Sequence, residues 1–113
     1  MTPLFLSLEN DPFRLSLDET NDCSVIAAAI VLGISYKEAH EFLKIRGRQN
    51  RSGIFSGDLL DAIYETKQIE DVTDNLLNHG KTVRTIERAN LKECYIMLIK
   101  QHVLVMKDGL VHD

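Results

Sequence analysis

The sequence predicts one α+β domain in which helices come first and antiparallel strands come last. Three observations support this order. Residues 23–32 are apolar on nearly every side, as in a buried helix. Residues 35–45 and 56–64 repeat apolar side chains with helical spacing. The end of the chain instead has short apolar runs of strand length, and Asp108-Gly109 between two of them is typical of a type I′ hairpin turn.

The pattern predicts a single domain over residues 1–113, a length sufficient for one hydrophobic core. Residues 1–20 contain both prolines of the chain and are expected to be irregular. Residues 21–90 are expected to be mainly helical, including a short helix near residues 83–89. Residues 94–113 are expected to form a small antiparallel sheet packed against the helices.

The expected helix boundaries follow from capping residues. Asp22 is a suitable N-cap for the first buried helix, and Gly33 stands where a C-terminal glycine ends one. Ser35 and Glu38 have the spacing of a capping box at the start of the second helix. Ser56 is a suitable cap for the third.

Composition narrows the classes of function. A net charge of −4 argues against a nucleic-acid-binding protein. The longest apolar run is about half of the ~20 residues that a membrane span needs. No secretory signal is visible, and two cysteines do not make a disulfide framework, so we expect free thiols and a cytoplasmic location. A short basic cluster is expected to be a solvated loop, with a patch that binds an anionic substrate or nucleic acid as the alternative; it consists of Lys44, Arg46, Arg48 and Arg51.

Cys23 is the first candidate for chemistry, because it opens the buried helix. The thiolate is the reactive form of cysteine, and the free N–H groups and dipole at a helix N-terminus favour negative charge. Cysteine is also a common core residue in apolar helices, as we expect for Cys94 in a strand. Position alone leaves both readings of Cys23 open.

The predicted hairpin brings His102 close to Asp113. If Asp108-Gly109 is a two-residue loop, residue 104 pairs with residue 113, and Asp113 becomes a diagonal neighbour of His102 at ~7 Å between backbones. A carboxylate there can orient an imidazole, as the third group of a nucleophile–base pair does. Asp108 lies roughly 20 Å of strand away and is the poorer partner. The other histidines have ordinary expectations: His40 on a polar helix face, His79 in a turn, and His112 on the opposite hairpin face.

A family resemblance rests on the order of five segments. They are residues 21–27 (NDCSVIA), 33–40 (GISYKEAH), 47–48 (GR), 80–85 (GKTVRT) and 101–109 (QHVLVMKDG). Together they resemble the papain-like cysteine peptidase fold, in particular compact members similar to the C39-like peptidases. This kind of small papain-like protein is frequent in tailed bacteriophages and their hosts. The resemblance spans about residues 20–113.

The resemblance implies a role for each matching position. Cys23 would be the nucleophile, His102 the general base and acid, and Asp113 the residue that orients His102. Papain-like enzymes usually have a glutamine shortly before the cysteine as an oxyanion-hole donor. This chain has none there, and Asn21 carries the same amide, with the Cys23 N–H as a second donor.

The expected function is therefore that of a cysteine hydrolase or peptidase acting on an amide or acyl bond. Deamidation or acyl transfer would use the same residues. The alternative is a catalytically inactive papain-like module that docks on a host or cellular protein. A protein or peptide substrate or partner is expected, without nucleic acid, membrane, metal or cofactor, in the cytoplasm, or in the host cytoplasm if the chain is phage-encoded.

Overall fold

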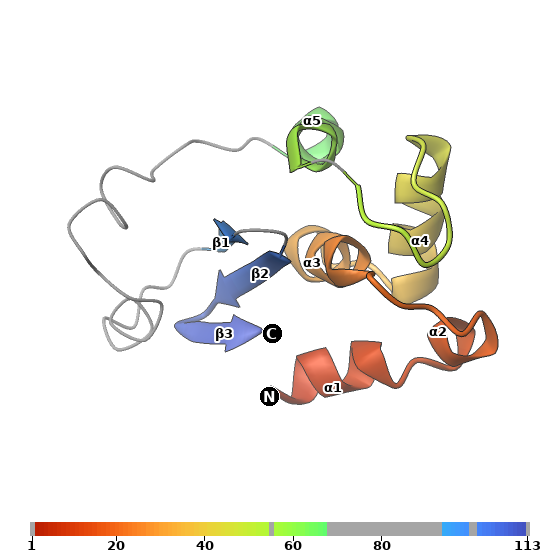
Figure 1. Cartoon of the computed structure of the whole chain (residues 1–113). Helices are drawn as coiled ribbons and strands as arrows, with labels where there is room; N and C mark the ends of the chain where they lie inside the picture. The colour runs from red at the N-terminus through yellow and green to blue at the C-terminus, as the bar shows by residue number, and fades with distance from the viewer. Residues whose placement is uncertain (1, 55, 68–93, 100–101, 113) are drawn as a thin grey trace.

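A computed structural model describes residues 2–54, 56–67, 94–99 and 102–112 of the chain, and it confirms the α+β class (Figure 1). Helices precede a three-stranded antiparallel sheet whose strand order is β1-β2-β3. The elements are α1 (Pro3–Glu9), α2 (Pro12–Ser16), α3 (Cys23–Leu32), α4 (Tyr36–Ile45), α5 (Ser56–Thr66), β1 (Tyr95–Ile99), β2 (His102–Lys107) and β3 (Leu110–His112). The helix predicted near residues 83–89 lies outside the described residues.

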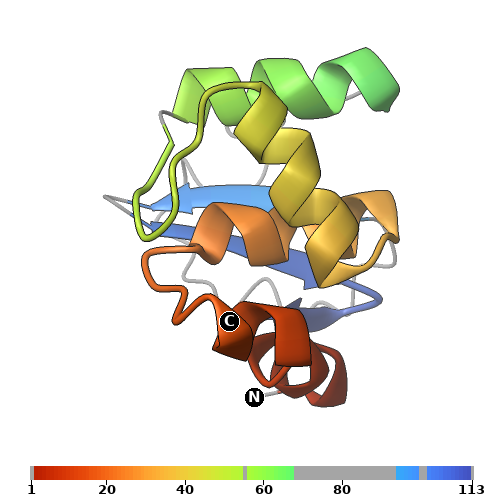
Figure 2. The same cartoon turned by 90° about the vertical axis from the view of Figure 1, so that its right-hand side faces the viewer.

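Helix α3 is the centre of the hydrophobic core. It packs against β2 on one side and α4 on the other, and Figure 2 shows it crossing in front of the strands. Every residue from Ser24 to Val31 is buried, so the apolar contacts offset the weak helix propensity of its β-branched side chains. Gly33 ends the helix with a φ of 67°, as predicted. Lys67 and Lys107 donate to carbonyls in its last turn, at 3.2 and 3.5 Å.

Helix α4 begins at the predicted capping box. The Ser35 side chain accepts from the Glu38 N–H at 3.1 Å, and the Glu38 carboxylate accepts from the Ser35 N–H. Its buried face carries Tyr36, Ala39 and Leu43 towards α3. Because this start is fixed by local hydrogen bonds, the register of the helix face follows from sequence alone.

The hairpin has the predicted register. Val105 pairs with His112 and Lys107 with Leu110, which leaves Asp108 and Gly109 as the two-residue turn. Both have positive φ, 56° and 79°, as a type I′ turn requires. Alternate residues of the strands serve two clusters. Val103 and Val105 pack against the α3 core, whereas Met97, Leu104 and Met106 form a separate cluster.

The prediction that residues 1–20 are irregular is wrong. Pro3–Glu9 form α1 and Pro12–Ser16 form α2, and each helix has a proline in its first turn, where the missing N–H costs no hydrogen bond. Thr2 and Asp11 are the N-caps, with side chains that accept from the N–H groups of Phe5 and Phe13. The prolines were therefore helix-starting signals.

The start of α1 lies beside the end of β3 (Figures 1 and 2). Thr2 Oγ1 and His112 Nδ1 are 2.6 Å apart, and this hydrogen bond joins α1 to β3. Among the described residues, no helix has both the length and the apolar character needed to cross a membrane.

Candidate functional site

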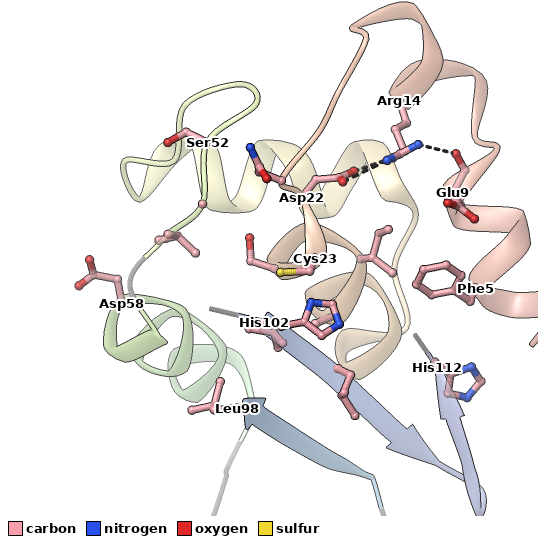
Figure 3. A pocket seen from close by; sticks show the side chains of 18 of the residues that line it. Phe5, Glu9, Arg14, Asp22, Cys23, Ser52, Asp58, Leu98, His102 and His112 are labelled. Carbon is pink, nitrogen blue, oxygen red and sulfur yellow. Dashed lines mark hydrogen bonds and ion pairs between the residues drawn. The ribbon is translucent and has the colours of Figure 1, made fainter. Parts of the chain in front are cut away.

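A cleft with a volume of about 1180 Å³ lies at the N-terminal end of α3 (Figure 3). Residues from α1, α3, α5, β2, β3 and the segment between α4 and α5 line it. Cys23, His102 and Asn21, three of the four predicted site residues, are among them. The fourth, Asp113, lies outside the described residues. The fold therefore brings to one cleft positions that are up to 81 residues apart in sequence.

Cys23 is the first residue of α3 and is partly exposed in the cleft. The first intrahelical bonds run from the Val25 and Ile26 N–H groups to the Asp22 carbonyl, at 3.0 and 3.1 Å. Within the described part of the chain, the N–H groups of Cys23 and Ser24 have no hydrogen-bond partner. Free N–H groups of this kind, together with the helix dipole, favour an anion at the helix start.

Asp22 occupies the predicted N-cap position but does not cap α3 with its side chain. Its carboxylate instead accepts from Arg14 Nε at 2.7 Å and from the Tyr36 hydroxyl at 2.7 Å. Burial raises the pKa of Asp22, but these two hydrogen bonds outweigh it and hold the pKa below its usual range. Burial, followed by the bond to Asp22, raises the pKa of Tyr36. Arg14 thus neutralises the charge of Asp22, and the Asp22 carboxylate makes no hydrogen bond to the N–H groups at the start of α3.

His102 is the first residue of β2 and is partly buried in the cleft wall. In the view of Figure 3 its ring lies directly below the Cys23 side chain. Alternation along β2 places His102 on the side of Leu104, away from the α3 core. His102 is nevertheless the first residue of β2, the middle strand, so it lies at one end of the sheet, where it lines the cleft together with the start of α3.

His112 pairs with Val105 and so lies on the hairpin face opposite His102, as predicted. It nevertheless lines the same cleft, where it is 8% exposed. Burial lowers the pKa of His112, because a charged imidazole is poorly solvated there. The Thr2 hydroxyl is hydrogen-bonded to its Nδ1 atom. Phe5 of α1 lines the cleft as well, and Figure 3 labels both His112 and Phe5.

Asn21 has a left-handed backbone with a φ of 52° and an exposed side chain. Its amide nitrogen donates to the Arg51 carbonyl oxygen at 3.3 Å. An amide nitrogen carries two hydrogens, so this bond fixes the side chain and leaves one N–H for another acceptor. Asparagine is one of the residues that adopts the left-handed region most readily.

A buried ionic cluster lies immediately before Asn21 in the chain. The Glu19 carboxylate, whose side chain has no exposed surface, accepts from Arg48 Nη2 at 3.0 Å and from His40 Nε2 at 2.9 Å. It also accepts from the backbone N–H of Arg51. We call Glu19, His40 and Arg48 the Glu19 cluster. It connects the segment before Cys23 to α4 and to the segment after it.

The partners of Glu19 in this cluster determine the pKa of its carboxylate. Burial raises the pKa of Glu19, but hydrogen bonds from Arg48, the Arg51 N–H and His40 outweigh this and lower it to about 2. Glu19 is therefore ionised at neutral and mildly acidic pH. A buried carboxylate of this kind is stable only while its partners remain in place.

Two sequence expectations are corrected by this cluster. His40 was placed on the polar face of α4, but it is 4% exposed and contacts the edge of the Phe13 ring. Arg48 was assigned to a solvated basic loop, but it is 4% exposed. No local pattern pairs Glu19 with a residue 29 positions later, so sequence reasoning could not find the cluster. Arg48 was noted only as part of the Gly-Arg segment in the family resemblance.

Other charged or metal-ligating types of side chain around the cleft could also bind a ligand. Arg14 is held by Asp22 and donates to the Glu9 carbonyl, as Figure 3 shows, and Arg46 is paired with Glu65. Cys94 is free, like Cys23, and burial raises the pKa of its thiol. Among the residues that the structure describes, no group of three or more histidine, cysteine, aspartate or glutamate side chains could hold a metal ion.

Comparison with protein-family models, with curated proteins and with solved structures finds no match for this chain. The chemistry of the cleft must therefore be inferred from its own residues. A partly exposed thiol at a helix N-terminus and an imidazole in the same cleft are the two groups that nucleophilic thiol catalysis uses.

Proposed function

We propose that the chain is a papain-like cysteine hydrolase in which Cys23 attacks the carbonyl carbon of an amide or acyl bond. The observation that carries this proposal is that Cys23, at the uncapped start of a buried helix, lines the same cleft as His102. Two features are needed for thiolate chemistry, an environment that favours the anion and a base near it, and this cleft has a candidate for each.

In the proposed reaction His102 takes the thiol proton and returns it to the leaving group. The tetrahedral intermediate would accept hydrogen bonds from the Cys23 N–H and from the free N–H of the Asn21 amide. Asp113 keeps its proposed role as the residue that orients His102. The hairpin register supports that role, since the pairing of Val105 with His112 makes residue 104 the partner of residue 113 if the ladder continues.

The substrate class that we propose is a protein or peptide amide. Peptide hydrolysis, deamidation and acyl transfer all pass through the same thioester, so the residues of the cleft suit each of them. We also propose that the chain is a cytoplasmic protein of the small papain-like type that is frequent in tailed bacteriophages, as the resemblance of its sequence implies. The other candidate is the inactive module that docks on a host or cellular protein through the same scaffold.

The first experiment measures the reactivity of the two thiols. The folded protein is titrated with iodoacetamide between pH 5 and pH 8, and the adducts are located by mass spectrometry. We expect Cys23 to react at pH 6 at least about tenfold faster than Cys94, because only Cys23 lies at a free helix N-terminus. His102→Ala should remove most of this advantage at low pH.

The matched control is His112→Ala, which removes the other histidine of the cleft. It should leave the ratio of the Cys23 and Cys94 rates unchanged, provided that circular dichroism shows a folded protein. Equal, slow alkylation of the two thiols in the parent protein would contradict the hydrolase and favour the docking module.

A further inference from the structure

We infer that Glu19 is a positioning residue for the oxyanion site: through Arg51 it holds the Asn21 amide in the orientation that catalysis needs. This inference deepens the proposed function and rests on it. Glu19 itself does not line the cleft and would not touch a substrate. Its effect passes through one backbone unit, that of Arg51, which it shares with Asn21.

The connection consists of two hydrogen bonds to the same residue. The Glu19 carboxylate accepts from the Arg51 N–H, and the Arg51 carbonyl accepts from the Asn21 side-chain nitrogen at 3.3 Å. Arg51 has a φ of 61° and Asn21 a φ of 52°, so both backbones are in the left-handed region. Such conformations persist only where surrounding contacts impose them.

The segment between Glu19 and Cys23 is held by the same cluster. The Thr20 N–H donates to the Glu19 carboxylate at 3.2 Å, and Arg48 Nη2 lies 3.5 Å from the Thr20 carbonyl. Arg48 also donates to the carboxylate with both terminal nitrogens, at 3.2 and 3.0 Å. A two-pronged contact fixes direction as well as distance, which a single lysine contact would not do.

This arrangement explains why a charged group is buried so close to the cleft. A buried ion pair contributes little net stability compared with apolar packing, whereas it specifies one geometry. Here the ion pair specifies the geometry of the segment from Glu19 to Cys23, which leads to the proposed nucleophile. One N–H of Asn21 is used to fix the side chain, and the second remains for the oxygen that becomes negative in the transition state.

The test separates oxyanion stabilisation from thiol reactivity by comparing two reagents at Cys23. With p-nitrophenyl acetate, the sulfur bonds to the carbonyl carbon, the carbonyl oxygen becomes negative, and p-nitrophenolate then leaves with its electron pair. The thiol proton passes to His102. With iodoacetamide, the sulfur displaces iodide from carbon and no oxyanion forms. The ratio of the acylation rate to the alkylation rate therefore reports on the oxyanion donors.

We expect Asn21→Gly and Glu19→Gln each to lower this ratio about tenfold or more, since removing one oxyanion donor typically costs about 10²–10³ in rate. Glycine keeps the left-handed backbone of position 21 and removes only the amide. The double variant should fall no further than Asn21→Gly alone, because Glu19 acts through Asn21. Both rates are measured under conditions in which circular dichroism shows the variant folded, so that unfolded molecules do not contribute to the ratio.

Glu41→Gln is the control, since it neutralises an exposed glutamate of α4 that does not line the cleft. It should leave the ratio unchanged. If Glu19→Gln does not fold, Arg48→Lys replaces it, because it keeps the charge but loses the two-pronged contact. An unchanged ratio in Asn21→Gly, or in a folded Glu19→Gln or Arg48→Lys, would overturn the inference while selective acylation of Cys23 upheld the proposed function. Absence of any selective reaction at Cys23 would overturn both.

Discussion

The two walls of the cleft are held in place by different forces. On the Cys23 side, buried charged groups fix the chain, with the side chains of Glu19 and Arg48 almost fully enclosed. On the His102 side, a hydrogen-bonded hairpin and apolar packing do so, and Val105 and Met106 have no exposed surface. The stability of the first wall should therefore depend on charge-changing substitutions and on pH. The stability of the second should depend on substitutions that change the turn conformation or the strand register.

The largest expected effect tests the charged wall directly. Arg48→Ala should lower the free energy of unfolding by about 3–5 kcal/mol, because it leaves the Glu19 carboxylate buried without its main partner. Urea denaturation at pH 7 measures the change. A loss below about 1 kcal/mol would mean that water or a rearrangement replaces the pair, and that this wall is not held by charge.

Acid should weaken the same wall. The pKa of Glu19 is about 2 in the folded protein, against an ordinary value of 4.5. Its stabilising contribution is therefore complete above about pH 4.5 and is lost as the pH falls towards 2, by about 3 kcal/mol in total. Urea unfolding at pH 7, 4.5, 3 and 2 gives the curve. A folded Glu19→Gln variant is the control and should lack this part of the acid dependence.

The hairpin wall should respond to its turn. Gly109 has a φ of 79°, which a side chain disfavours, so Gly109→Ala should cost about 1–2 kcal/mol of unfolding free energy. The measurement is thermal unfolding at two pH values. The loss should be the same at pH 7 and at pH 4.5, because no charge changes. A strongly pH-dependent loss would show that the two walls are coupled.

The smallest expected effect sets the scale for the others. Glu65→Gln removes the partner of Arg46 in an ion pair whose glutamate side chain is 65% exposed. Exposed pairs contribute about 0–1 kcal/mol, so we expect a change in unfolding free energy below about 0.5 kcal/mol in urea denaturation. A loss as large as that of Arg48→Ala would remove the distinction between buried and exposed pairs in this protein.

The sequence predicted the hairpin wall well because its signals are local. Asp108-Gly109 specified the turn, and the turn specified which residues pair. Gly33 and the Ser35 capping box were likewise read correctly, since each depends on residues a few positions apart. Cys23 and His102 reach one cleft because these two local features, a helix start and a strand start, meet in the fold.

The sequence predicted the charged wall poorly because its contacts are distant. Asp22 had the right residue type for a cap, but Arg14 and Tyr36 take its carboxylate, and neither is marked as a partner by spacing. His40 looked solvent-facing because a polar residue on an amphipathic helix usually is, and Glu19 reversed that. Each of these errors in the charged wall concerns a polar side chain whose partner is not adjacent in sequence.

The hydrogen bond between Thr2 and His112 has a practical consequence for anyone handling this protein. Since it joins Thr2 to a histidine that lines the cleft, an affinity tag or fusion partner attached close to Thr2 or His112 would start near the candidate site. Reactivity measurements therefore call for a tag that is cleaved off. For the same reason, an environment-sensitive dye attached near either end would report directly on occupancy of the cleft.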